Sequence, residues 1–296
     1  KNIAVIGLGS MGYGMAQSCL RAGLVTHGFD IAPEPVTRFR AQGGAEGTLN
    51  GVAARLDAVV VVVLNAAQTE AVLFGENGIA PQLTKGAVIL AAATVPPSFA
   101  RKMEASCAEL GLHYLDAPIS GGSVKAAAGQ LSIMASGTEE AFAAARPVLD
   151  AMAEKVFDLG RSAGPGSAMK SVNQLLAGVH IAAMAEAMTF GMTQGIRPEV
   201  FLDVIPQCAG TSWMLENRAP QNVAGDYTPH RQVNICPKDL GIVLDSAEET
   251  DFNAPNTEAA LQQYRTAVDM GLGKQDDAAI AKVYAAASGL TLPGDV

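Results

Sequence analysis

A glycine-rich turn near the start of the chain constrains the fold more than any other feature. The segment "GLGSMG" follows the β-rich run Asn2–Ile6 and precedes a helical pattern over Met11–Ala22. In this setting the first glycine permits a tight turn, the second lets the backbone approach a pyrophosphate, and the third lets helix and strand pack closely. We therefore expect a dinucleotide to bind the six residues of the turn: Gly7, Leu8, Gly9, Ser10, Met11 and Gly12.

The end of the second β-rich run indicates which dinucleotide binds. Asp30 closes the run Val25–Asp30, where a carboxylate accepts hydrogen bonds from both ribose hydroxyls of NAD and repels the extra phosphate of NADP. No arginine follows immediately, because the next residue is Ile31 and Ala32–Pro33 come after it. The sequence predicts NAD as the cofactor, with Asp30 and Ile31 beside its ribose. The alternative is a surface turn with a solvated aspartate.

The first 160 residues alternate between β-rich and helical patterns. The segment "DAVVVVVL" is apolar at consecutive positions, as expected of a central strand that helices cover on both faces. Alternating β and α units predict a doubly wound parallel sheet of the Rossmann type. The predicted strands are Asn2–Ile6, Val25–Asp30, Asp57–Leu64, Ala87–Thr94, His113–Asp116, Leu131–Ala135 and Lys155–Asp158, and the helices include Met11–Ala22, Ser98–Leu110 and Glu139–Ala153.

The pattern becomes helical after the glycine- and proline-containing segment Arg161–Ser167. No proline interrupts Ser167–Met192, which predicts one helix about 39 Å long with apolar residues on nearly every face. We therefore expect an NAD-binding domain over 1–161, and a long connecting helix with an all-α substrate and oligomerisation domain over 162–296. The helices predicted beyond the long one are Pro198–Ile205, Lys238–Thr250, Thr257–Met270 and Asp276–Ser288.

Charge and composition exclude several classes of partner. The formal net charge is −9, which disfavours binding to nucleic acid or to an anionic membrane. The longest apolar run, Ala58–Leu64, is far shorter than the roughly 20 residues of a membrane span. The four cysteines and four histidines are too scattered to form a metal site, so we expect no metal and reduced thiols in the cytoplasm.

Three further segments carry a family resemblance. They are "DAPISGGSVKAAAGQLSIMASG" (Asp116–Gly137), "GPGSAMKSVNQLL" (Gly164–Leu176) and "KDLGIVLDSA" (Lys238–Ala247). With the glycine-rich turn they follow the order of the β-hydroxyacid dehydrogenase family, which includes 3-hydroxyisobutyrate dehydrogenases and tartronate semialdehyde reductases. The resemblance implies NAD-dependent oxidation of a small hydroxy acid. A catalytically silent NAD-binding sensor or scaffold is the alternative from a different functional class.

Lys170 is the predicted catalytic residue. It is the only cation between Arg161 and Arg197, on an otherwise apolar helix next to the predicted hinge. A lysine shielded from water gives up its proton more easily, which suits a group that accepts the proton of an alcohol. The resemblance implies this role, and it also implies that Ser120, Gly121 and Gly122 bind the substrate carboxylate through a hydroxyl and unobstructed N–H groups.

Other site residues follow from helix spacing and from the resemblance. Gln174 lies four residues after Lys170, where the family usually has asparagine, and Asn173 is beside it. The resemblance places Lys238 toward the cofactor and substrate. It also places Leu64, Asn65 and Thr94 near NAD, at the carboxyl ends of strands, although a strand-end turn and a helix N-cap are the alternatives for these positions.

Three segments resemble in particular the branch of the family that oxidises L-threonate. They are "LLAGVHIAAMAEAM" (Leu175–Met188), "AGTSWMLENR" (Ala209–Arg218) and "GDYTPH" (Gly225–His230). L-threonate carries several hydroxyls, which polar groups would bind: Gln174, Ser212 and Asn217 around Trp213, and His230 with Arg231. We expect oxidation to 2-dehydro-L-erythronate, with 3-hydroxyisobutyrate or tartronate semialdehyde as the alternative substrate. The apolar long helix also predicts a homodimer or homotetramer.

Overall fold

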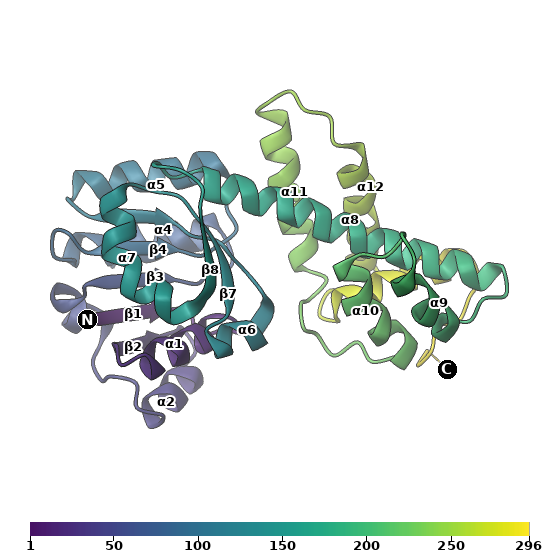
Figure 1. Cartoon of the computed structure of the whole chain (residues 1–296), viewed down its shortest axis with the longest axis horizontal. Helices are drawn as coiled ribbons and strands as arrows, with labels where there is room; N and C mark the ends of the chain where they lie inside the picture. Colours follow the sequence, from purple (N-terminus) through teal and green to yellow (C-terminus); the bar gives the residue numbers. More distant parts are fainter. Residues whose placement is uncertain (296) are drawn as a thin grey trace. The chain divides into compact units, whose positions relative to one another are not determined.

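The structure, a computed structural model, describes residues 1–295 and divides the chain into two compact units (Figure 1). The first unit is Lys1–Lys170, and the second begins at Ser171. A domain boundary was expected after residue 161. The observed division lies later, within the long helix, because the first turn of that helix is hydrogen-bonded to the first unit.

A five-stranded parallel sheet forms the centre of the first unit, in the order β2-β1-β3-β4-β5. All five strands were predicted, although β2, β3 and β4 are shorter than their predicted ranges. The strands are β1 (Asn2–Ile6), β2 (Val25–Phe29), β3 (Ala58–Val61), β4 (Val88–Ala91) and β5 (His113–Asp116).

Helices cover both faces of this sheet and create two separate cores. On β3, Val60 belongs to the core that contains Met15 of α1, whereas Val59 and Val61 belong to the core that contains Met103 of α5. This alternation explains the continuous valine run and confirms the doubly wound fold. The helices of this unit include α1 (Gly12–Arg21), α2 (Pro33–Ala41), α3 (Leu49–Val52), α4 (Ala66–Phe74), α5 (Pro97–Glu109), α6 (Gly122–Ala128) and α7 (Glu139–Met152).

The last strands of the first unit form a second sheet, which the sequence analysis did not separate from the first. Its strands are β6 (Ile119–Ser120), β7 (Leu131–Ala135) and β8 (Ala153–Asp158). β7 is parallel to β8, but β6 pairs with β7 in the antiparallel sense, with Ser120 opposite Ser132. Only residues 121–130 separate β6 from β7, and a parallel connection needs a dozen or more residues.

The predicted long helix is α8 (Pro165–Thr193), which has 29 residues. By length and composition it could cross a membrane, and half of its most apolar window is buried. Five of its residues belong to the core of the second unit: Ile181, Ala182, Met184, Ala185 and Met188. α8 is therefore a core helix of the second unit.

The described part of the second unit contains helices and no named strand, as predicted for an all-α domain. Its core surrounds Tyr264, which is fully buried and donates a hydrogen bond to the carbonyl of Gly178 (3.0 Å). One helix of this unit, α10, was not predicted, and its interior contains Pro220. The helices after α8 are α9 (Pro198–Val204), α10 (Trp213–Ala224), α11 (Ile235–Glu248), α12 (Pro255–Asp269) and α13 (Ala281–Ala287).

Candidate active site

The glycine-rich turn joins β1 to α1 in a geometry that only glycine allows at two positions. Gly7 has a φ of 96°, and a Cβ there would lie 2.1 Å from the carbonyl oxygen of Val62. A Cβ on Gly12 would lie 1.8 Å from the carbonyl oxygen of Gly7. A Cβ on Gly9 would meet no atom within 4 Å, so the open side of the turn is at Gly9. This arrangement fits a bound pyrophosphate, whose close approach needs open backbone beside a helix N-terminus.

Asp30 follows β2 directly and lies next to the turn. One carboxylate oxygen accepts a hydrogen bond from the backbone N–H of Leu8 (2.6 Å), and the other accepts one from Ala32 (2.8 Å). A carboxylate has about four acceptor positions, so two remain for the hydroxyls of a ribose. Ile31, the next residue, has a fully exposed side chain.

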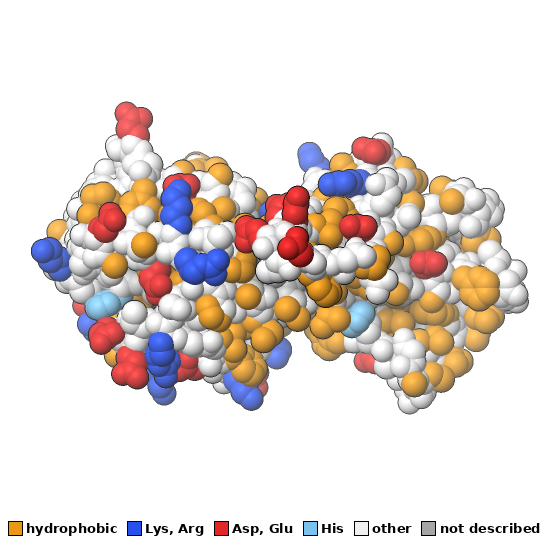
Figure 2. Space-filling view, turned by 90° about the horizontal axis from the view of Figure 1, so that it is seen from above, with side chains coloured by type: hydrophobic (Ala, Val, Ile, Leu, Met, Phe, Trp, Pro, Cys, Tyr) orange, Lys and Arg blue, Asp and Glu red, His pale blue; other side chains and the backbone are white. Residues whose placement is uncertain are grey.

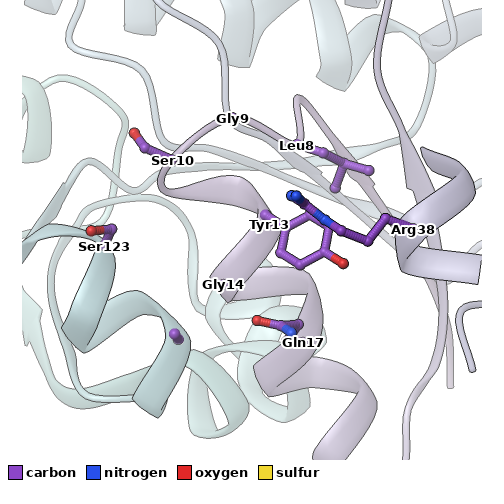
Figure 3. Close-up of a pocket in the computed structure, with 9 residues that line it drawn as sticks. Leu8, Gly9, Ser10, Tyr13, Gly14, Gln17, Arg38 and Ser123 are labelled. Atoms are coloured by element: carbon purple, nitrogen blue, oxygen red, sulfur yellow. The ribbon is translucent and has the colours of Figure 1, made fainter. Parts of the chain in front are cut away.

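A hollow of ≈ 440 Å³ lies beside the turn and contains a cation that the sequence analysis did not identify (Figure 3). Arg38 of α2 extends across the ring of Tyr13, with its guanidinium carbon 4.2 Å from the ring centre. Figure 3 shows Ser10 and Ser123 on the other side of the hollow. A cation here attracts an anionic ligand such as a diphosphate. Arg38 was missed because the search for a cation covered only the residues directly after Asp30, whereas Arg38 lies within the helix that follows, α2.

The residues expected at the ends of β3 and β4 differ in exposure and in the bonds they make. Leu64 has 57% of its side chain exposed, and Thr94 is half-buried. Asn65 is the N-cap of α4, where its side-chain oxygen accepts the N–H of Gln68 (2.9 Å). The helix-cap alternative therefore holds for the side chain of Asn65, and its assignment to NAD stays a prediction.

Lys170 is buried, with 9% of its surface exposed, in the second turn of α8. Its Nζ donates a hydrogen bond to the carbonyl oxygen of Ile119 (2.9 Å). Because Ile119 precedes Ser120 on β6, this bond places the amine beside the segment expected to bind the substrate carboxylate. The structure thus brings together Lys170 and the serine–glycine segment within the first unit.

Asp116, at the end of β5, fixes the start of α8 and thereby the position of Lys170. Its carboxylate accepts hydrogen bonds from the hydroxyl and the N–H of Ser167 (2.6 and 2.8 Å) and from the N–H of Gly164 (3.0 Å). Burial raises the pKa of Asp116, and these hydrogen bonds oppose the rise. The sequence analysis quoted Asp116 as the first residue of a motif but gave it no role; its place at a strand end was the available signal.

Ser120, Gly121 and Gly122 form the connection from β6 to α6. Gly121 and Gly122 have φ values of 136° and 76°, which non-glycine residues rarely adopt. Successive backbone N–H groups in such a segment can converge on an anion. The local geometry is therefore compatible with the expected carboxylate binding.

In the second unit, Gln174 and Lys238 converge on a buried carboxylate. Gln174 Nε2 donates to Asp239 Oδ2 (2.5 Å), and Lys238 Nζ lies 2.9 Å from Asp239 Oδ1. Asn173 Nδ2 donates to Gln174 Oε1 (2.9 Å). Lys238 lies in the first turn of α11, as expected, and its neighbour Asp239 supplies the negative charge that offsets the helix dipole.

Trp213 and His230, also predicted to bind substrate, are exposed on the second unit. The exposed fraction of Trp213 is 68%, and the backbone N–H of His230 donates to Asp276 (2.7 Å). Three polar residues grouped with them make bonds within the second unit, and their contact with the substrate stays a prediction. Ser212 caps α10, Asn217 accepts a bond from Arg218, and Arg231 pairs with Asp239 and Asp277.

No group of three or more potential ligands that could hold a metal ion occurs among residues 1–295, and the four cysteines are free. Three of the cysteines are buried and Cys208 is exposed.

Two family profiles match the chain, one for each part. Residues 2–160 match the family described as "NAD binding domain of 6-phosphogluconate dehydrogenase". Residues 164–284 match the family described as "NAD-binding of NADP-dependent 3-hydroxyisobutyrate dehydrogenase".

Relatives resemble the chain over nearly its full length. An L-threonate dehydrogenase of Cupriavidus necator is 49% identical and covers 99% of this chain and 98% of its own length; one of Haemophilus influenzae is 47% identical over 99% and 97%. A crystal structure of 3-hydroxyisobutyrate dehydrogenase from Salmonella typhimurium has a TM-score of 0.89 and 45% identity over 95% of this chain and 99% of that one. The chain therefore belongs to the 3-hydroxyisobutyrate dehydrogenase-like family and is an NAD-dependent hydroxyacid dehydrogenase.

Proposed function

We propose that this enzyme oxidises L-threonate to 2-dehydro-L-erythronate, with Lys170 as the general base. The observation that carries the catalytic assignment is the buried amine of Lys170, hydrogen-bonded to the carbonyl of Ile119 next to Ser120. The names of relatives that are 45–49% identical over nearly the whole chain support L-threonate as the substrate.

The proposed reaction divides between the cofactor and the residues of the chain. NAD, when bound, supplies the acceptor for the hydride of the carbinol carbon. Lys170 in its neutral form accepts the hydroxyl proton at Nζ, so the carbonyl group forms as the O–H bond breaks. The hydrogen bond to Ile119 fixes the amine before the substrate arrives, which reduces the entropic part of the barrier.

Substrate and cofactor contacts are assigned by chemistry. Ser120, Gly121 and Gly122 bind the carboxylate, and Gln174 with Asn173 binds hydroxyl groups. The glycine-rich turn, Asp30 and Arg38 hold NAD. Trp213 and His230 are further substrate contacts. The further cofactor contacts are Ile31, Leu64, Asn65, Thr94 and Lys238.

A second candidate substrate is 3-hydroxyisobutyrate, because the similar Salmonella typhimurium structure carries that enzyme's name. Steady-state rates distinguish these candidates. L-threonate and 3-hydroxyisobutyrate are measured with NAD, and tartronate semialdehyde is measured with NADH. We expect kcat/KM to be highest for L-threonate, since a site of hydrogen-bonding groups rejects analogues that lack hydroxyls. A higher kcat/KM for 3-hydroxyisobutyrate would reject L-threonate and keep the family assignment.

We also propose that the enzyme is a cytoplasmic homodimer or homotetramer. The free cysteines support a reducing compartment. Exposed residues on α8 recur at helical spacing (Ala183, Ala187 and Phe190), and Figure 2 shows wide hydrophobic areas on the second unit. Light scattering coupled to gel filtration measures the mass, and a monomer would contradict this proposal.

A further inference from the structure

Gln174 and Lys238, which the proposed function assigns to substrate and cofactor, both contact one buried carboxylate. That carboxylate has no role in the proposed function. Asp239 of α11 is 2% exposed. One of its oxygens accepts the bond from Gln174 of α8 at 2.5 Å, and the other is paired with Lys238 at 2.9 Å. A single buried carboxylate therefore restrains two side chains from two helices.

Asp239 is itself held in place by a chain of buried charges with alternating sign. Arg231 lies 3.5 Å from Asp239 Oδ2 and 3.6 Å from Asp277 Oδ2. Asp277 in turn accepts a bond from Nε of Arg218 at 2.5 Å. Burial alone would raise the pKa of Asp239, but Arg231 and Lys238 hold it below its ordinary value, so the carboxylate stays ionised at neutral pH.

The charge on Asp239 determines which way the carboxamide of Gln174 faces. An ionised carboxylate only accepts hydrogen bonds, so the amide nitrogen of Gln174 must face it. The amide oxygen then receives the donor of Asn173 at 2.9 Å. Both ends of the carboxamide are therefore defined, whereas an unrestrained glutamine would exchange them by rotation about its last torsion.

We propose that Asp239 is a positioning residue for substrate specificity, which orients the carboxamide of Gln174 toward the hydroxyl groups of the hydroxy acid. This inference rests on the proposed role of Gln174 in substrate binding. It also gives the extra methylene of Gln174 a purpose, because asparagine at this position is shorter and would not reach the carboxylate.

A double-mutant cycle tests whether Asp239 acts through Gln174. The variants are Asp239→Asn, Gln174→Ala and the double variant, measured with NAD and L-threonate. We expect Asp239→Asn to raise KM roughly tenfold in the wild-type background and less than about twofold in the Gln174→Ala background. The same increase in both backgrounds would overturn the inference.

Asp277→Asn is the matched control for loss of a buried charge. Asp277 is also fully buried in the same charge network, but its ion pairs are with Arg218 and Arg231. We expect it to lower the melting temperature and to change KM by less than about twofold. If Asp277→Asn raises KM as much as Asp239→Asn does, the role of Asp239 is merely structural and the inference is overturned.

Gln174→Asn is a second variant that leaves all the buried charges in place. We expect it to raise KM about as much as Asp239→Asn does, because the shorter amide loses its bond to Asp239. A wild-type KM in Gln174→Asn would overturn the inference.

Nuclear magnetic resonance tests the orientation without any turnover. The side-chain amide signals of Gln174, identified by their loss in Gln174→Ala, should shift in Asp239→Asn and stay in place in Asp277→Asn. Unchanged signals in Asp239→Asn would overturn the inference. A wild-type enzyme that oxidises no hydroxy acid would overturn the proposed function instead, and the two failures are thus distinguishable.

Discussion

At the scale of single residues, Asp30 shows how one side chain serves both structure and recognition. Its carboxylate accepts the backbone N–H groups of Leu8 and Ala32, so it braces the glycine-rich turn as well as carrying a negative charge. Arg38 brings a positive charge into the hollow beside the same turn. We therefore propose that the choice between NAD and NADP depends on the balance of these two charges.

Replacing Asp30 by asparagine should shift the cofactor preference toward NADP. Asparagine keeps one oxygen for the backbone and removes the charge that repels the 2′-phosphate. A repulsion of about 1–4 kcal/mol predicts at least a roughly fivefold rise in the ratio of kcat/KM for NADP to that for NAD. Asp150→Asn, which removes an exposed charge paired with Arg146 at 2.8 Å, is the control and should change the ratio little. An unchanged ratio in Asp30→Asn would contradict the role of Asp30.

The contributions of Asp239 and Asp277 to the free energy of unfolding should depend on pH in opposite directions. Although burial raises it, the pKa of Asp239 is lowered overall by Arg231 and Lys238 below the ordinary value of 3.8. Its stabilisation is therefore present above pH 3.8 and is lost as the pH falls below it. Burial raises the pKa of Asp277 despite the same arginine, so ionisation of Asp277 costs stability as the pH rises through that raised value.

Denaturant unfolding between about pH 6 and pH 3 measures these dependences. The stability difference between the wild type and Asp239→Asn should shrink as the pH falls, whereas that between the wild type and Asp277→Asn should grow. Parallel trends for the two variants would show that the two carboxyls do not differ in the stated way.

At the scale of elements, the helices and strands that follow from local pattern were predicted, and those that depend on distant contacts were not. The valine run of β3 and the length of α8 are properties of a single segment. The anchoring of α8 by Asp116 is not, because it joins residues 51 positions apart in sequence. The pairing of Ser120 with Ser132 was missed because β6 has only two residues and no β-rich run of its own. Lys170 could be selected as the isolated cation of α8, but its bond to Ile119 required the fold.

Two glycines of the turn between β1 and α1 should respond differently to alanine. Gly9→Ala adds a methyl group into open space, so the melting temperature should stay unchanged while the dissociation constant of NADH rises by about an order of magnitude. Gly12→Ala forces a methyl group against the backbone of Gly7 and should lower the melting temperature. Thermal unfolding and NADH fluorescence measure both effects. Wild-type NADH affinity in Gly9→Ala would contradict the proposed approach of the pyrophosphate.

At the scale of the whole molecule, the sequence predicted a parallel α/β unit followed by an all-α unit, with a boundary after residue 161, whereas the compact units divide after Lys170. The first turns of α8 belong to the first unit because Asp116 binds Gly164 and Ser167, and Lys170 is the last residue of that unit. The bonds made by the polar groups expected to bind hydroxyls were the least predictable part. Ser212 caps α10, Asn217 accepts a bond from Arg218, and Arg231 belongs to a buried charge network, so their contact with the substrate stays a prediction.

The oxidation of L-threonate by Lys170→Ala, with NADH binding measured alongside, tests the central claim most directly. Loss of a general base predicts a kcat lower by roughly two to four orders of magnitude. The dissociation constant of NADH should stay at its wild-type value, since the glycine-rich turn, Asp30 and Arg38 remain in place. A Lys170→Ala enzyme with near-normal turnover would contradict the account and would require another residue to accept the hydroxyl proton.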